Sequence, residues 1–191
     1  GVRGSGKTVF MTSVANILGA KPDWVVVNLS VDRDLLLAMT AKLSDYKGLE
    51  KILDNAKINL SVFGLPVEVS RDNKIIDIGN ELAKMLAKLT KHNKKILVTI
   101  DEVVANQNMV EFASMFQIYM REKYNVFLLM TGLYENIYEL QNKKSLTFLY
   151  RAPRLQLEPL SISMITYNYK KSFNLPDDKA VAMARFTEGY P

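Results

Sequence analysis

The chain has 191 residues, of which 48% are hydrophobic, and this length and composition are typical of one soluble globular domain. Its net charge of +5 requires neither an anionic ligand nor nucleic acid. It contains no cysteine and a single histidine, so disulfide frameworks, thiolate metal sites and histidine clusters are excluded and any metal must be bound by oxygen ligands. No apolar run approaches the roughly 20 residues that span a bilayer and the first residues do not form a secretory signal, so we expect a cytoplasmic protein without membrane contact.

The first eight residues, GVRGSGKT, fit the phosphate-loop pattern G-x-x-x-x-G-K-[ST]. Glycines at these positions let backbone N–H groups approach phosphates, and the helix that follows adds its positive end. We expect Lys7 to reach the β- and γ-phosphates and the Thr8 hydroxyl to ligate Mg²⁺. The alternative is a chance glycine-rich turn. The predicted phosphate-binding residues are Gly1, Arg3, Gly4, Ser5, Gly6, Lys7 and Thr8.

A phosphate loop normally follows a buried strand, whereas here the pattern begins at Gly1. We therefore expect the chain to be a segment of a longer protein that lacks its first strand and continues beyond Pro191.

Helices and strands alternate along the rest of the chain. Apolar residues at helical spacing predict helices over 7–18, 32–43, 49–56, 74–92, 110–124, 134–141, 161–173 and 177–187. Short β-branched or apolar runs predict strands over 24–29, 95–100, 126–130 and 154–157, and 57–70 resembles a hairpin around Gly64 and Pro66. This rhythm predicts a mainly parallel sheet with helices on both faces, a three-layer α/β/α fold that ends near Leu160 and binds its ligand at the carboxyl ends of the strands.

The predicted strand ILVTIDE ends in two carboxylates. Asp101 is placed to hold Mg²⁺ directly or through water, and Glu102 to deprotonate a water that attacks the γ-phosphate. The alternative is that both acids cap the next helix, since carboxylates are favoured there. No N-K-x-D motif occurs and Asp101 does not begin a D-x-x-G, so ATP is expected rather than GTP.

Two further positions are candidates for catalysis. Thr131 follows the strand over 126–130, where its hydroxyl can position the attacking water or, alternatively, cap the next helix. Arg151 and Arg154 precede the strand predicted over 154–157, and an arginine there can contact phosphate in its own chain or across a subunit boundary. Solvation at the surface is the alternative for both arginines.

Together, GVRGSGKT, ILVTIDE, LLMTG, FLYRAPRLQLEPLS and FTEGYP resemble the AAA+ P-loop ATPases, and among them the archaeal-type and STAND-like ATPases. The resemblance implies a Walker A motif at 1–8, a Walker B motif at Asp101 and Glu102, a sensor 1 residue at Thr131 and an arginine finger at Arg151. It also implies a P-loop ATPase core over 1–160 and the truncated start of a helical lid region over 161–191.

Five lysines, Lys84, Lys88, Lys91, Lys94 and Lys95, lie close together in the sequence. They can track a nucleic-acid backbone or form the solvated face of a helix, which we favour. Six tyrosines are better explained by core or interface packing than by base stacking. They are Tyr119, Tyr124, Tyr134, Tyr138, Tyr167 and Tyr169.

The sequence thus predicts an ATP-binding and ATP-hydrolysing AAA+ or STAND-like domain that couples its nucleotide state to a conformational change or to assembly, as a homo-oligomer or with a partner protein. An ATP-dependent DNA-binding loader or initiator module with slow hydrolysis is the alternative, and DNA is then the partner. A P-loop phosphotransferase acting on a small molecule is a third hypothesis, against which Glu102 and the AAA+-like tail argue.

Overall fold

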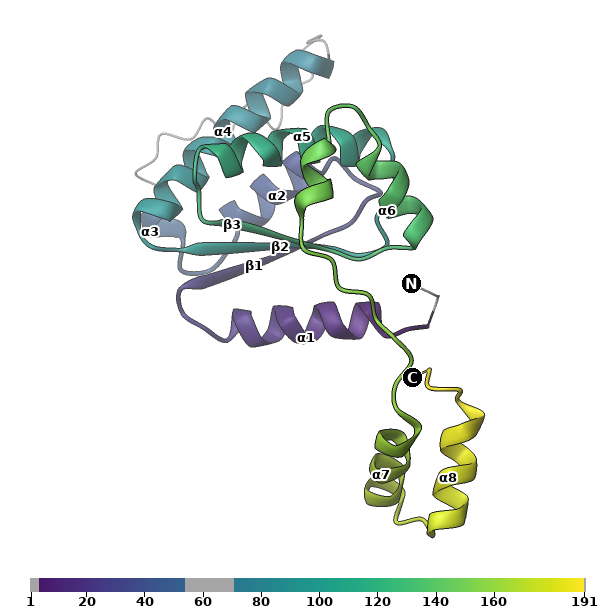
Figure 1. The fold of residues 1–191 in the computed structure, drawn as a ribbon. Coiled ribbons are helices and arrows are strands. Elements are labelled where there is room, and N and C mark those ends of the chain that lie inside the picture. The colour runs from purple at the N-terminus through teal and green to yellow at the C-terminus, as the bar shows by residue number, and fades with distance from the viewer. Residues whose placement is uncertain (1–3, 54–70, 191) are drawn as a thin grey trace. The chain divides into compact units, whose positions relative to one another are not determined.

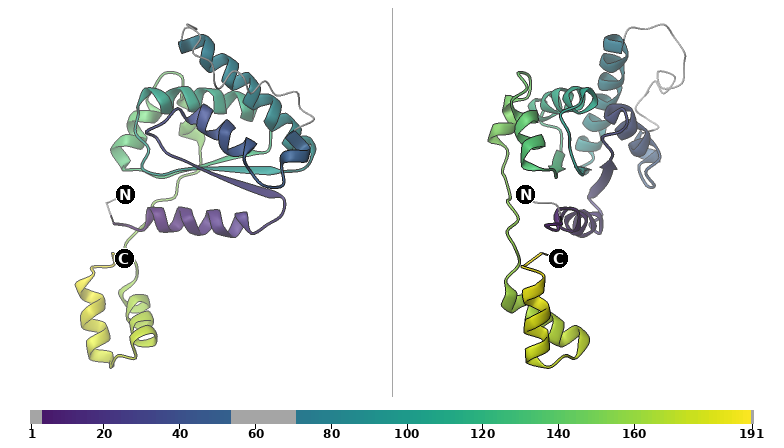
Figure 2. Two further views of the ribbon diagram at one scale, coloured as in Figure 1. Left: turned by 180° about the vertical axis from the view of Figure 1, so that it is seen from behind. Right: turned by 90° about the vertical axis from the view of Figure 1, so that its right-hand side faces the viewer.

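The computed structural model of the chain describes residues 4–53 and 71–190 (Figures 1 and 2). The chain divides into two compact units, one formed by Gly1–Phe10 with Pro153–Pro191 and the other by Met11–Ala152. The hairpin predicted over 57–70 lies outside the described residues.

A three-stranded parallel sheet forms the centre of the larger unit. Its strands are β1 (Trp24–Leu29), β2 (Lys95–Ile100) and β3 (Val126–Met130), in the spatial order β1-β2-β3. In the register of the sheet Val27 lies beside Val98, and Val98 beside Leu128. All three strands have the bounds predicted from the sequence. The predicted α/β class with a parallel sheet is therefore confirmed.

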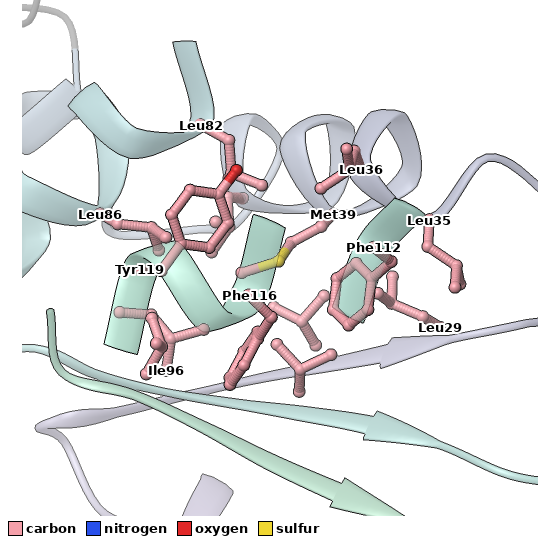
Figure 3. Packing of buried hydrophobic residues seen from close by; sticks show 14 of the residues in the cluster. Leu29, Leu35, Leu36, Met39, Leu82, Leu86, Ile96, Phe112, Phe116 and Tyr119 are labelled. Atoms are coloured by element: carbon pink, nitrogen blue, oxygen red, sulfur yellow. The ribbon is translucent and has the colours of Figure 1, made fainter. Parts of the chain in front are cut away.

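Helices α2 (Leu35–Ser44), α4 (Arg71–Lys91) and α5 (Gln107–Arg121) cover one face of this sheet (Figure 1). Alternate residues of the strands point toward them, because side chains along a strand alternate between the two faces. The short α3 (Glu50–Leu53) packs against α4. Figure 3 shows part of the resulting core, which includes Leu29, Leu35, Leu36, Met39, Leu82, Leu86, Ile96, Phe112, Phe116 and Tyr119.

The opposite face of the sheet is covered by α1 (Lys7–Gly19), whose residues from Met11 onward belong to the same unit (Figure 1). A Cβ atom at Gly19 would lie 3.4 Å from the Val26 side chain, so the helix passes close to β1. Phe127 on β3 nevertheless remains 44% exposed, with its ring 5.1 Å from that of Trp24. Helices thus lie on both faces, an arrangement compatible with a three-layer α/β/α fold.

The chain leaves β3 through α6 (Tyr134–Gln141) and the 3-10 helix η3 (Thr147–Arg151). Residues 152–160, which contain the strand predicted over 154–157, form no strand in the structure, so that prediction is wrong and the sheet ends at Met130 rather than near Leu160. The alternating letters RLQL resemble a strand, but a strand also needs a neighbour to accept its backbone hydrogen bonds.

In the smaller unit, α7 (Ile162–Phe173) and α8 (Asp177–Phe186) pack against each other as a helical hairpin. Asn174 takes a left-handed conformation at the end of α7, and Lys170 forms an ion pair of 2.6 Å with Asp177 across the turn. The residues after α8 return to the start of the hairpin, where the Leu160 N–H donates to the Gly189 carbonyl at 2.7 Å.

Candidate functional site

The predicted phosphate loop turns through two left-handed glycines. Gly4 has φ +75° and Gly6 has φ +78°, a region in which a side chain would strain the backbone. The first hydrogen bond of α1 joins the Phe10 N–H to the Gly6 carbonyl at 2.9 Å. The loop therefore ends where the helix starts, as a phosphate loop requires. Gly1 and Arg3 lie outside the described residues.

The side chains expected to bind phosphate and metal lie in the first turn of α1. Lys7 is half-buried, and its ammonium group donates to the Ser5 hydroxyl at 3.2 Å. Thr8 is exposed. The N-terminal turn of a helix has backbone N–H groups without intrahelical acceptors and carries a partial positive charge. This end of α1 can consequently bind an anion.

The two predicted catalytic acids follow the central strand β2 at the carboxyl edge of the sheet. Asp101 is half-buried and Glu102 is exposed. The Glu102 N–H donates to Asp101 Oδ1 at 3.0 Å, and Glu102 has φ +50°, which is uncommon for a residue other than glycine. The chain thus bends sharply between the two carboxylates.

Thr131 lies beside Asp101 at the end of the neighbouring strand. It is 8% exposed, and its hydroxyl forms a short hydrogen bond with Asp101 Oδ1. Its backbone N–H donates to the Ile100 carbonyl at 3.0 Å. The residue at the N-cap of α6 is Leu133, without a side-chain hydrogen bond, so Thr131 does not cap that helix. The hydroxyl instead orients the carboxylate predicted to bind Mg²⁺.

The helix that follows the two acids is capped by another residue. Asn106 Oδ1 accepts a hydrogen bond from the Met109 N–H at 2.9 Å at the start of α5. Asp101 and Glu102 therefore do not cap α5, and the alternative interpretation of these acids is wrong. Asn106 was not predicted as the cap, although an asparagine before a helical pattern is a common N-cap signal.

A second polar pair lies on β1 and β2, near their carboxyl ends. The Thr99 hydroxyl donates to Asn28 Oδ1 at 2.5 Å. Thr99 is 2% exposed, whereas Asn28 is exposed. The sequence analysis missed this pair because no local pattern joins residues that are 71 positions apart.

The two candidate arginines lie after α6, near the point where the chain passes from one compact unit to the other. Arg151 is the last residue of η3 and is exposed, and Arg154 belongs to the smaller unit. Within 4–53 and 71–190, no three His, Cys, Asp or Glu side chains form a group that could hold a metal ion. Mg²⁺ bound to a nucleotide does not require such a group, since phosphate and water oxygens supply most of its ligands.

Three of the five clustered lysines bind other parts of the same molecule. Lys84 forms an ion pair of 2.6 Å with Glu81. Lys94 donates to the Pro22 carbonyl at 2.9 Å, and Lys95 forms an ion pair of 2.8 Å with Asp23. The hydrogen bond from Lys95 lowers the pKa of Asp23. These contacts give Lys84, Lys94 and Lys95 structural roles within the chain.

The tyrosines differ in burial more than the sequence indicates. Tyr119 is fully buried, and its hydroxyl donates to the Gly79 carbonyl at 3.0 Å, so core packing is right for this residue. Burial raises the pKa of its phenol. Tyr134, Tyr138 and Tyr167 are 64%, 53% and 65% exposed, so they lie outside the core, and interface packing stays the prediction for them.

Comparisons with family models, curated proteins and solved structures find no match for this chain. By its fold, the chain is an α/β protein with a three-stranded parallel sheet and with polar side chains at the carboxyl ends of its strands. The resemblance to AAA+ ATPases rests on the motifs alone and stays a prediction. In the part of the chain that the structure describes, no helix is long and apolar enough to cross a membrane.

Proposed function

We propose that the chain is a P-loop ATPase domain of AAA+ or STAND-like type, which binds ATP with Mg²⁺, hydrolyses it and couples the nucleotide state to a conformational change or to assembly. The observation that carries the proposal is the loop with left-handed Gly4 and Gly6 that leads directly into α1. Left-handed glycines before a helix allow backbone N–H groups to approach a phosphate, and this supports the proposal.

In this proposal the loop and Lys7 bind the phosphates of ATP. Backbone N–H groups at the start of α1 donate to phosphate oxygens. When ATP binds, the hydrogen bond from the Lys7 ammonium group to the neutral Ser5 hydroxyl, 3.2 Å long, would be replaced by hydrogen bonds to the β- and γ-phosphates. This exchange is favourable because a hydrogen bond between two charged groups is stronger than one to a neutral acceptor.

From the two sequence motifs, we propose Thr8, in the unit that contains Gly1–Phe10, and Asp101, in the unit Met11–Ala152, as oxygen ligands of the metal. A hydroxyl and a carboxylate are oxygen ligands, which Mg²⁺ prefers. The carboxylate of Asp101 accepts hydrogen bonds from the Glu102 N–H and the Thr131 hydroxyl, and these bonds fix its orientation. The bound ion would neutralise charge that develops on the phosphates.

Glu102 is the proposed general base. Its carboxylate accepts a proton from water while the water oxygen bonds to the γ-phosphorus, and the bond from that phosphorus to the bridging oxygen breaks to release ADP and inorganic phosphate. Thr131 contributes by fixing Asp101 and, as expected of a sensor 1 residue, by contacting the water. Arg151 is the candidate for a phosphate contact from the same chain or from a neighbouring subunit.

The test is to measure ATP binding and turnover with Mg²⁺ for the wild type, Lys7→Ala and Glu102→Gln. We expect Lys7→Ala to lose binding and Glu102→Gln to bind ATP without turnover. Lys21→Ala and Glu188→Gln are matched controls, because Lys21 is an exposed lysine near the other end of α1 and Glu188 is an exposed glutamate that also has φ +50°. Both controls should behave as the wild type.

The outcomes separate the proposed function from its alternative. A wild type that binds no ATP would contradict the proposal. Binding without turnover would favour a nucleotide-dependent switch or loader module, and repeating the assay with DNA tests whether DNA is its partner. Measuring the molecular mass with and without ATP would show whether nucleotide drives assembly.

A further inference from the structure

The loop between β2 and α5, residues 101–106, is held from both sides. On the side of β3, the Val103 N–H donates to the Thr131 carbonyl at 2.9 Å, and the Val103 side chain is fully buried. A Cβ atom at Gly132 would lie 3.0 Å from the Val103 side chain, so the two segments are in close contact. Movement of the loop would break both this hydrogen bond and this packing.

On the side of β1, the loop is held by the Asn106 side chain. Asn106 Nδ2 donates to the Val31 carbonyl at 3.1 Å, in the connection between β1 and α2. Asn106 Oδ1 accepts from the Met109 N–H, so the orientation of the amide is fixed: only the nitrogen is left to face Val31. One side chain therefore joins the loop to a segment 75 residues away.

Both contacts help to fix the position of the two acids. Along the chain, Asp101 and Glu102 lie between β2 and the contact residues Val103 and Asn106. Glu102 has φ +50°, and a left-handed glutamate is kept only where its surroundings determine the backbone. Val103 follows it directly, and Asn106 ends the loop four residues after it. If the contact of Asn106 with Val31 is lost, the loop loses its hydrogen bond to the connection after β1 and keeps its contacts with Thr131.

We propose that Asn106 is a positioning residue for Asp101 and Glu102, which holds the loop that carries them to the connection after β1. This inference rests on the proposed function, since it assigns to these carboxylates metal binding and water activation. Asn106 does not touch the reacting atoms, and its effect passes through the loop.

Capping α5 does not by itself require an asparagine. Serine and aspartate cap helices about as well, but neither carries a side-chain N–H that can donate to the Val31 carbonyl. Asp34 illustrates the simpler role in the neighbouring helix α2, where its carboxylate accepts from the Leu37 N–H at 3.0 Å. The hydrogen bond from Asn106 Nδ2 to the Val31 carbonyl is therefore not needed for capping α5.

The test replaces Asn106 by serine, which keeps a cap for α5 but is too short to reach Val31. Asp34→Ser is the control, because it also replaces a capping side chain by serine, in α2. Among the described residues, the Asp34 carboxylate accepts only from the Leu37 N–H and makes no hydrogen bond to residues 101–106. For each variant we would measure ATP affinity without Mg²⁺, the Mg²⁺ concentration that half-saturates turnover, kcat and thermal stability. Loss of a group hydrogen-bonded directly to a metal ligand typically lowers metal affinity or activity about 10- to 100-fold, and because Asn106 acts on Asp101 only through the loop, we expect the lower end of this range.

We expect Asn106→Ser to bind ATP without Mg²⁺ as the wild type does, and to need at least about ten-fold more Mg²⁺ or to lose about ten-fold in kcat. Asp34→Ser should change neither. If the wild type hydrolyses ATP and Asn106→Ser shows the same Mg²⁺ dependence and kcat, Asn106 only caps α5 and the inference fails alone. If the wild type binds no ATP, the proposed function fails and removes the inference with it.

Discussion

The hydrogen bond between Thr131 and Asp101 can be tested without any assumption about function. Thr131→Val removes the hydroxyl at nearly constant volume, whereas Thr131→Ser keeps the hydroxyl and loses a methyl group. The hydroxyl is at a position that is only 8% exposed and it donates to a carboxylate. We therefore expect Thr131→Val to lower the free energy of unfolding relative to Thr131→Ser.

The size of the effect follows from the partners. Hydrogen bonds to charged groups contribute about 1.5–3 kcal/mol, and because Asp101 is only half-buried we expect the lower end, about 1.5 kcal/mol. A double-mutant cycle with Asp101→Ala should give a coupling energy of similar size, since the two side chains touch. The cycle separates the hydrogen bond from the packing of the valine methyl groups.

Urea unfolding followed by tryptophan fluorescence is a suitable assay. The chain contains one tryptophan, Trp24, which lies on β1 in the same compact unit as Thr131 and Asp101. The signal therefore reports the unit in which the substitutions lie. A coupling energy within about 0.3 kcal/mol of zero would refute the reasoning, because the two sites would then be energetically independent.

Two further predictions concern the core and the backbone. Tyr119→Phe removes the hydroxyl bonded to the Gly79 carbonyl and should cost about 1 kcal/mol at pH 7. Because burial raises the phenol pKa in the folded state above its unfolded value of about 10, the contribution of Tyr119 to stability should be constant below about pH 10 and fall as the pH rises above it. Urea unfolding between about pH 8 and 11 should therefore show a smaller fall in stability for Tyr119→Phe than for the wild type, and equal slopes for both proteins would contradict the assignment. Gly189→Ala should destabilise the smaller unit by more than about 1 kcal/mol, because the residue has φ +86° and a Cβ would lie 2.7 Å from the Leu160 carbonyl oxygen. The control is Gly48→Ala, at φ +89° with no atom within 4 Å of the new Cβ, which measures the backbone strain alone. In Gly189→Ala we also expect faster hydrogen exchange of the Leu160 amide, which donates to the Gly189 carbonyl. An unchanged exchange rate would show that the contact relaxes freely.

The limits of the sequence prediction are clearest where a segment depends on a distant neighbour. Residues 154–157 have the alternation of a strand but find no partner strand. Lys84, Lys94 and Lys95 form a basic cluster in the sequence, and only the structure shows that they contact Glu81, Pro22 and Asp23. Tyr134 and Tyr138 show the same limit, since helical spacing gives no direct measure of exposure. Burial and pairing are properties of the assembled fold.

By itself, the sequence determined the three strands and α6 at their observed bounds, because short runs of apolar residues and the helical period are local signals. It also placed Asp101 and Glu102 at the end of a buried strand and the glycine loop before a helix, since both motifs are contiguous. Only the tertiary structure decided that Thr131 binds Asp101 and that Asn106 joins the loop after β2 to Val31. These contacts join residues 30 and 75 positions apart, and packing of neighbouring strands and connections, rather than local propensity, brings them together.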